Sequence, residues 1–219
     1  MAAIRATVPV EIPPLGLAGD LHLPDRAKGL ILFAHGSGSS RFSPRNQQVA
    51  QALNAAGFAT LLLDLLTEDE ADDRANVFDI DLLAERLTQA IDWARAAPAL
   101  AALPIGLFGA STGAAAALTA AAARPQGVAA VVSRGGRPDL AAAALPEVTT
   151  PTLLIVGGRD EPVIAWNQQA QRRLGGPSRL EIVPGATHLF EEPGTLEAVV
   201  DLALAWFSEH LVVAARARA

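Results

Sequence analysis

Short apolar runs alternate with longer stretches of helical periodicity along most of this chain. Each run is almost entirely apolar, which is typical of a strand buried on both faces of a parallel sheet. These predicted strands are 29–34, 58–63, 104–108, 128–132, 152–156 and 180–183. Between them, apolar positions recur every three to four residues, which predicts amphipathic helices. The predicted helices are 43–56, 79–97, 111–123, 162–174 and a last one that includes 196–207.

This alternation predicts an α/β fold with a mostly parallel central sheet and helices on both faces. Two shorter strands, 7–12 and 16–23, flank the turn at Pro13-Pro14 and predict an antiparallel hairpin at one edge of the sheet. No repeat or linker interrupts the pattern, so residues 1–219 are predicted to form a single domain. No insertion is long enough for a large cap domain, and the acidic run 68–73 is predicted to be a solvated loop.

Composition narrows the classes of function. The chain has 17 basic against 23 acidic residues and no cluster of Lys or Arg long enough for a nucleic-acid footprint, so we exclude nucleic-acid binding. It has no cysteine, which excludes disulfides, thiolate metal sites and a cysteine nucleophile. The first residues lack the apolar segment of a secretory signal, and no apolar stretch approaches the roughly 20 residues that cross a bilayer. We therefore expect a cytoplasmic protein without membrane contact.

The segment Gly109-Ala110-Ser111-Thr112-Gly113 fits the pattern G-x-S-x-G. It follows a predicted strand and precedes a predicted helix, which is the context of a nucleophile elbow. Such a turn is tight, so small residues are needed two positions to either side of the serine, and glycines stand there. We predict that Ser111 is a nucleophile. The competing interpretation is a glycine-rich turn that only caps the helix.

An acid and a histidine follow in the order that this kind of site requires. Asp160 lies just after the predicted strand 152–156 and the glycines at 157 and 158. This is the edge of the sheet where ligands bind in α/β folds. Its competing role is a helix cap before Pro162. His188 lies in the loop after the last predicted strand. We predict that His188 is the general base and that Asp160 orients it.

Backbone N–H groups are predicted to stabilise the oxyanion of the reaction. Thr112 follows the nucleophile and supplies one donor, and Ser37, in the loop after the first buried strand, is chosen by position as the second. His35 is predicted to brace that loop by hydrogen bonding. In this mechanism His188 takes the proton of Ser111, an acyl-enzyme forms, and water hydrolyses it. Neither a metal nor an organic cofactor is needed.

Four segments together resemble the α/β-hydrolase superfamily: His35-Gly36, Gly109–Gly113, Gly158-Arg159-Asp160 and Gly185-Ala186-Thr187-His188. The resemblance covers about residues 29–211, and the uncapped layout is similar to the dienelactone hydrolase-like proteins. Dienelactone hydrolases proper use a cysteine nucleophile, whereas Ser111 stands in that place here. The resemblance therefore implies the fold and the triad, with an activity closer to that of a carboxylesterase.

Specificity has weaker signals. Arg134 and Arg137 follow a predicted strand at the site's edge of the sheet, and arginine suits planar anions such as a substrate carboxylate. The competing and favoured interpretation is a bracing ion pair, for which Asp139 is the nearest partner. Phe190, Phe42 and Trp166 are expected either to line the pocket or to belong to the core.

The leading hypothesis is therefore a serine esterase whose partner is a small-molecule ester or lactone. One alternative keeps the triad and transfers the acyl group to an acceptor other than water. The other is a non-catalytic binding module on a hydrolase fold, since a fold does not fix a function. The sequence leaves association into a homo-oligomer open.

Overall fold

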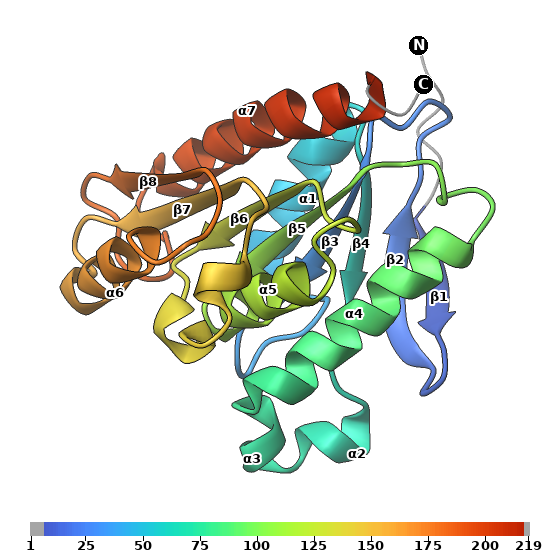
Figure 1. Ribbon diagram of the computed structural model, residues 1–219, viewed down its shortest axis with the longest axis horizontal. Coiled ribbons are helices and arrows are strands. Elements are labelled where there is room, and N and C mark those ends of the chain that lie inside the picture. Colours follow the sequence, from blue (N-terminus) through green and yellow to red (C-terminus); the bar gives the residue numbers. More distant parts are fainter. Residues whose placement is uncertain (1–6, 217–219) are drawn as a thin grey trace.

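The computed structural model describes residues 7–216, and within them the chain forms an eight-stranded sheet (Figure 1). The strands are β1 (Val8–Ile12), β2 (Leu17–His22), β3 (Leu30–Ala34), β4 (Ala59–Leu63), β5 (Ile105–Ala110), β6 (Ala130–Arg134), β7 (Thr152–Gly157) and β8 (Ser178–Val183). Their order is β1-β2-β4-β3-β5-β6-β7-β8. Strands β3 to β8 are parallel, and the hairpin β1–β2 adds two antiparallel strands at one edge. The predicted fold class and the edge hairpin are confirmed.

Helices cover both faces of this sheet, as predicted (Figure 1). They are α1 (Pro44–Ala55), α2 (Glu68–Ala71), α3 (Arg74–Val77), α4 (Ile80–Ala96), α5 (Thr112–Ala123), α6 (Glu161–Gln171) and α7 (Thr195–Arg216). Helices α1 and α7 lie on one face, while α4, α5 and α6 lie on the other. Two short 3₁₀ turns, Pro138–Ala141 and Leu145–Glu147, connect β6 to β7.

Alternate residues of β3 belong to two separate apolar cores, one on each face of the sheet. Leu30 and Leu32 belong to the core under α4 and α5. Ile31 and Phe33 belong to the core under α1 and α7, where Phe33 packs on Phe108 at 4.9 Å between ring centroids. Successive side chains of a strand point to opposite faces, so a strand between two helical layers must be apolar throughout. This is why the sequence shows continuous apolar runs rather than alternation.

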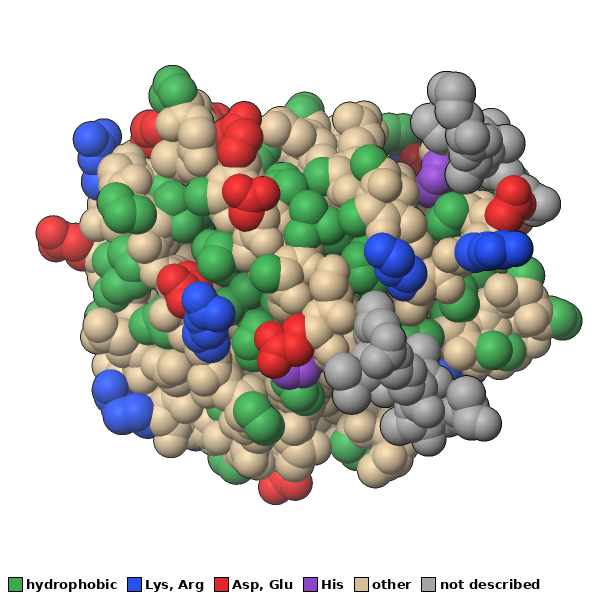
Figure 2. Space-filling view, turned by 90° about the horizontal axis from the view of Figure 1, so that it is seen from above, with side chains coloured by type: hydrophobic (Ala, Val, Ile, Leu, Met, Phe, Trp, Pro, Cys, Tyr) green, Lys and Arg blue, Asp and Glu red, His purple; other side chains and the backbone are tan. Residues whose placement is uncertain are grey.

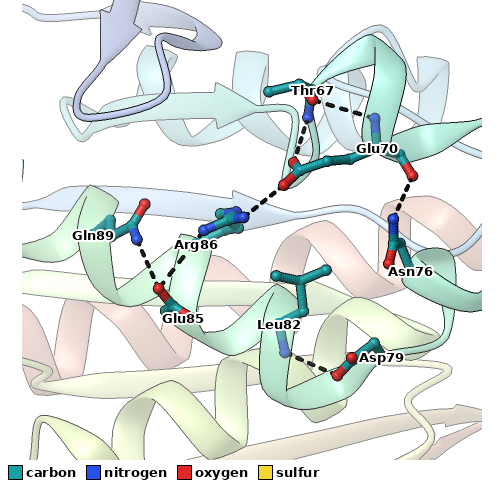
Figure 3. Close-up of polar contacts among 8 residues, drawn as sticks. All are labelled: Thr67, Glu70, Asn76, Asp79, Leu82, Glu85, Arg86 and Gln89. Carbon is teal, nitrogen blue, oxygen red and sulfur yellow. Dashed lines mark hydrogen bonds and ion pairs between the residues drawn. The ribbon is translucent and has the colours of Figure 1, made fainter.

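The prediction that the acidic run 68–73 is a loop is wrong, because most of this run is helical. Residues 68–71 form α2, whose start has a capping box: Thr67 Oγ1 accepts from the Glu70 N–H, and the Glu70 carboxylate accepts from the Thr67 N–H. Figure 3 shows that the same carboxylate also accepts from Arg86 of α4, at 2.6 Å. The acidic run is helical because its charges lie at a helix N-terminus and one of them has a cationic partner.

The predicted strand 128–132 is displaced by two residues. The ladder of β6 runs from Ala130 to Arg134, where Arg134 is in register with Ala110 of β5 and Ile155 of β7. Ser133 and Arg134 are therefore strand residues with buried side chains and do not belong to the loop. Polarity alone predicted the loop, but pairing with both neighbouring strands extends the strand through two polar residues.

On the surface seen in Figure 2, acidic and basic side chains are interspersed among apolar and neutral ones. That face has no basic stripe, in agreement with the excess of acidic residues in the sequence. Among residues 7–216, no helix combines the length and the apolar composition that crossing a bilayer requires.

Candidate active site

The three residues predicted as a triad come from three loops at one edge of the sheet. Ser111 follows β5, Asp160 follows β7, and His188 follows β8. In a parallel sheet the carboxyl ends of the strands share an edge, so residues far apart in the sequence meet there. The loop after β3, residues 36–43, reaches the same place and is called the oxyanion loop below.

Ser111 lies in a tight turn between β5 and α5. Its φ of 52° and ψ of −119° are rare for a residue with a side chain, and the strain projects its hydroxyl out of the turn. A Cβ at Gly109 would stand 2.4 Å from the Ala114 Cα, and a Cβ at Gly113 would stand 2.2 Å from the Ala34 oxygen. Both distances are too short for any side chain. The two glycines are thus required by the close approach of the turn to its surroundings, as the motif predicts.

His188 lies between the other two side chains. Its Nδ1 is 2.6 Å from the Asp160 Oδ2, and its Nε2 is 3.3 Å from the Ser111 Oγ. With the proton on Nδ1 donated to the carboxylate, Nε2 is left as the acceptor for the serine hydroxyl. The Asp160 side chain is mostly buried and that of His188 is partly exposed. This geometry allows His188 to take a proton from Ser111.

Asp160 is at the N-cap position of α6, yet its side chain makes no capping hydrogen bond. Its carboxylate is instead bound to His188. The competing role of Asp160 as a helix cap is therefore absent.

The two predicted oxyanion donors, Thr112 and Ser37, lie beside the turn that carries Ser111 and differ in their hydrogen bonds. Thr112 is the first residue of α5, where backbone N–H groups lack partners within the helix. The Ser37 N–H donates to the Thr112 Oγ1 at 2.8 Å. Ser37 is thus beside the site, as predicted, but its amide is engaged by the threonine side chain. The Thr112 hydroxyl remains able to donate its own hydrogen.

His35 holds the base of the oxyanion loop. Its Nδ1 is 3.0 Å from the Gly36 oxygen, and its Nε2 accepts from the Leu65 N–H at 3.3 Å. These contacts need a neutral imidazole with the proton on Nδ1. Burial lowers the pKa of His35, partly offset by its hydrogen bond to Gly36 and by Asp64, and so favours that neutral form. The contacts fit the bracing role predicted for His35.

Two cavities flank the oxyanion loop. The first, of about 240 Å³, holds the triad's reacting atoms and is called the nucleophile cavity. It is lined by Gly36, Ser37, Ser39, Ser43, Arg45, Asn46, Ala110, Ser111, Arg134, His188 and Leu189. The second, of about 330 Å³, is called the cover cavity because α2 and α3 form one of its walls. It is lined by residues 35–42 and by Asp64, Leu66, Thr67, Glu68, Ala71, Val77, Leu83 and Thr112.

The residues proposed from the sequence for specificity separate into two groups. Arg137 is bound to Asp139 by two hydrogen bonds of 2.9 and 2.7 Å, as the bracing interpretation predicts, and its guanidinium stacks on Trp166. Arg134 instead lines the nucleophile cavity, and its Cζ lies over the Phe190 ring at 5.8 Å from the ring centroid. Phe190 itself is a buried core residue with a φ of 56° in the loop that carries His188. Phe42 lines the cover cavity and is exposed.

Sequence reasoning missed two residues on α1 that line the nucleophile cavity, Arg45 and Asn46. Helix α1 begins directly after the oxyanion loop, with Ser43 as its cap, so its first turn reaches the site's edge of the sheet. This position directly after the oxyanion loop was the sequence signal that could have identified both residues as part of the site. In the described part of the chain, no group of three or more His, Asp or Glu side chains is arranged to hold a metal ion.

A family model described as an alpha/beta hydrolase domain matches residues 27–209, so the chain belongs to the α/β-hydrolase family. A crystal structure of dienelactone hydrolase from Anabaena variabilis is 56% identical, with a TM-score of 0.90, over 96% of this chain and 99% of that one. The protein is therefore dienelactone hydrolase-like, as the sequence motifs indicate. Est1E from Butyrivibrio proteoclasticus, at 17% identity and a TM-score of 0.79 over 94% and 98% of the two chains, shares the fold.

Two proteins of Mycobacterium tuberculosis, each named "Putative phosphoribosyl transferase", are 59% identical over 204 residues. The match covers 93% of this chain but 46% of theirs, so the chain spans about half the length of these curated relatives. More than half of each relative lies outside the match, and its name belongs to that longer protein.

Proposed function

We propose that this chain is a serine hydrolase that cleaves small carboxylic esters or lactones through an acyl-enzyme on Ser111. The observation that carries the proposal is the position of His188, bonded to Asp160 on one side and within reach of Ser111 on the other. A neutral histidine so placed is the general base that a serine nucleophile needs. The α/β-hydrolase family and the strained turn at Ser111 support the same conclusion.

The reaction follows from these contacts. His188 Nε2 takes the proton as the Ser111 Oγ attacks the acyl carbon, and Asp160 stabilises the imidazolium that forms. The negative charge that develops on the carbonyl oxygen is stabilised by the N–H of Thr112 and the α5 N-terminus, together with the Thr112 hydroxyl or the Ser37 N–H behind it. The imidazolium then protonates the leaving oxygen, and the C–O bond breaks. Water, deprotonated by His188, releases the acid.

The test compares the wild type with Ser111→Ala on a p-nitrophenyl ester series from acetate to octanoate. We expect turnover by the wild type and a loss of about 10⁴-fold or more in the variant, because the nucleophile and its base act as a unit. Added alcohol separates hydrolysis from acyl transfer by the products formed. A fluorophosphonate probe should label the wild type at Ser111 and leave the variant unlabelled.

Equal activity of the two proteins would refute Ser111 as the nucleophile. Absence of both turnover and labelling would favour the non-catalytic binding module. Release of pyrophosphate from a phosphoribosyl donor, unaffected by Ser111→Ala, would instead support the activity named for the Mycobacterium tuberculosis relatives.

A further inference from the structure

Arg134 is a buried cation without a counter-charge. Its side chain is among the buried ones, at 6% exposure, and its Nε is fully buried without a hydrogen-bond partner. Among residues 7–216 its guanidinium makes no hydrogen bond or ion pair, and its Cζ lies over the ring of Phe190 at 5.8 Å from the centroid. Burying an unpaired charge is costly, and proteins ordinarily pair such a charge. Arg134 lines the nucleophile cavity, so its missing partner belongs to whatever fills that cavity.

The charges around Arg134 add to its need for an anion. Burial, and secondarily repulsion from Arg45, lowers the pKa of Arg134 to about 10, so the group is still a cation at neutral pH. Arg45 lines the same cavity and is bonded to the exposed Glu191 at 3.2 Å, and its own Nε is also without a partner. The carboxylate of Asp160 is bound to His188. Two arginines therefore line the nucleophile cavity beside Ser111, and none of the described residues that line it is an aspartate or a glutamate.

The arrangement of the two cavities indicates which end of the ester carries the negative charge. His188 must protonate the leaving oxygen, so the leaving group departs on the side that His188 lines. That side is the nucleophile cavity, which also holds Arg134 and Arg45. The cover cavity lacks Ser111 and His188 but reaches Thr112, and Leu66, Ala71, Val77 and Leu83 give it an apolar wall. An acyl portion that extended past Thr112 would face that wall.

We propose, resting on the esterase function above, that the substrate is an ester with an apolar acyl portion and a negatively charged leaving group whose carboxylate or phosphate binds Arg134. Arg45 supplies a second positive charge at the mouth of the same cavity. In the reaction, the Ser111 Oγ–acyl bond forms, the bond to the leaving oxygen breaks, and the proton from Ser111 passes through His188 to the departing anionic alcohol. The arginine fork fits a planar carboxylate or a phosphate.

The experiment uses two esters that share an acetyl group and differ in the charge of the leaving group, 4-acetoxybenzoate and its neutral methyl ester. The measured quantity is the ratio of their kcat/KM values, which does not depend on the fraction of active protein. We expect the wild type to favour the anionic ester and Arg134→Met to lower that ratio about tenfold or more, since a charge-assisted hydrogen bond is lost. Arg134→Lys should restore part of the ratio, because it keeps the charge without the fork.

Two matched controls locate the effect. Arg137→Met removes a neighbouring arginine that is held by Asp139, and Arg179→Met removes an exposed one on β8 that pairs with Glu181. Both should keep the wild-type ratio. A mono-4-nitrophenyl succinate, with its charge on the acyl portion, should be a poorer substrate than 4-nitrophenyl butyrate. 4-Acetoxyphenyl phosphate, compared with 4-acetoxybenzoate, distinguishes a phosphate from a carboxylate ligand.

A ratio near one in the wild type, or a ratio unchanged by Arg134→Met, overturns the proposal while leaving the esterase function intact. A preference for the succinate ester overturns the assignment of the charge to the leaving group. Binding of 4-hydroxybenzoate to Ser111→Ala, measured by calorimetry with and without Arg134→Met, tests the anion site independently of hydrolysis. Loss of binding in the double variant supports the anion site. If the wild type cleaves no ester, that result refutes the esterase function and leaves the anion site standing.

Discussion

Thr112 contributes more than the backbone N–H group for which the motif singles it out. Its side chain is buried and its Oγ1 accepts the Ser37 N–H, so the amide of the oxyanion loop polarises this hydroxyl. A hydroxyl that accepts one hydrogen bond becomes a better donor for the next. The threonine next to the nucleophile thus links the oxyanion loop to the elbow.

Replacing Thr112 with Val keeps the shape of the side chain and removes the hydroxyl. We expect kcat for p-nitrophenyl acetate to fall by about a hundredfold with little change in KM, the loss typical of one oxyanion donor. Thr112→Ser should restore most of the rate. A Val variant with kcat close to that of the wild type would show that the Ser37 N–H, released from Thr112, serves as the donor by itself.

Single residues were predictable from the sequence where a motif restricts the backbone. The elbow at Ser111 and the chain order of Asp160 and His188 located three side chains that the structure brings within 2.6 and 3.3 Å. Arg134 was identified as a candidate, but neither its burial nor its lack of a partner could be predicted. Those properties depend on which strands flank β6 and on what the loops leave open above it. The Arg45 side chain was missed although its position directly after the oxyanion loop was an available signal.

At the scale of elements, α2 and α3 form a small cover beside the oxyanion loop. Figure 3 shows how this cover is attached: Glu70 of α2 accepts from Arg86 of α4, and the Glu70 backbone oxygen accepts from Asn76 of α3 at 2.9 Å. Hydrogen bonding by the Thr67 backbone, with Arg86 as a further cause, lowers the pKa of Glu70 and keeps it ionised. The cover is thus held to α4 by the Glu70–Arg86 ion pair, and Val77 of α3 packs against the core under α4 and α5.

We predict that Arg86→Met loosens this cover. The change should lower the free energy of unfolding by only about 1 kcal/mol, since the ion pair is partly exposed. It should raise the hydrogen-exchange rates of amides 67–78. It should also broaden the preference for acyl chain length, because Ala71 and Val77 of this segment line the cover cavity. Arg124→Met is the control. It removes an arginine bonded to Asp92, which lies on α4 like Arg86, and it should change neither property. Unchanged exchange in Arg86→Met would contradict this role of the ion pair.

Elements were predictable wherever the apolar pattern was long. The buried strands and the long helices were anticipated to within a few residues, because a strand or helix between two cores must be apolar at fixed spacings. The helix α2 was missed because it has no buried side chain and therefore no apolar pattern. Its start was nevertheless encoded locally, since Thr67 and Glu70 have the spacing of a capping box.

At the scale of the whole molecule, His35 makes the stability of the fold depend on pH. Its pKa in the folded protein is lowered by burial, whereas in the unfolded chain it is near the ordinary value of about 6.5. Below that value the unfolded chain binds more protons than the folded one, so the free energy of unfolding falls as the pH falls. The contribution of neutral His35 is complete only above about pH 6.5.

We therefore predict that urea unfolding of the wild type shows a marked loss of stability between about pH 7 and pH 5. His35→Gln should be less stable than the wild type at pH 8, since the contacts to Gly36 and Leu65 are disturbed. The variant should also lose less stability over the same pH interval. Parallel curves for the two proteins would assign the pH dependence to other groups.

The cover made of α2 and α3 adds no strand to the sheet, and it lies between Leu66, three residues after β4, and Asp79, the N-cap of α4. It lines the cover cavity but not the nucleophile cavity. We therefore expect that this segment can be replaced without disturbing the residues that line the nucleophile cavity. Grafting a longer or more apolar loop between Leu66 and Asp79 should change which acyl groups the protein accepts, while Ser111, Asp160 and His188 keep their positions.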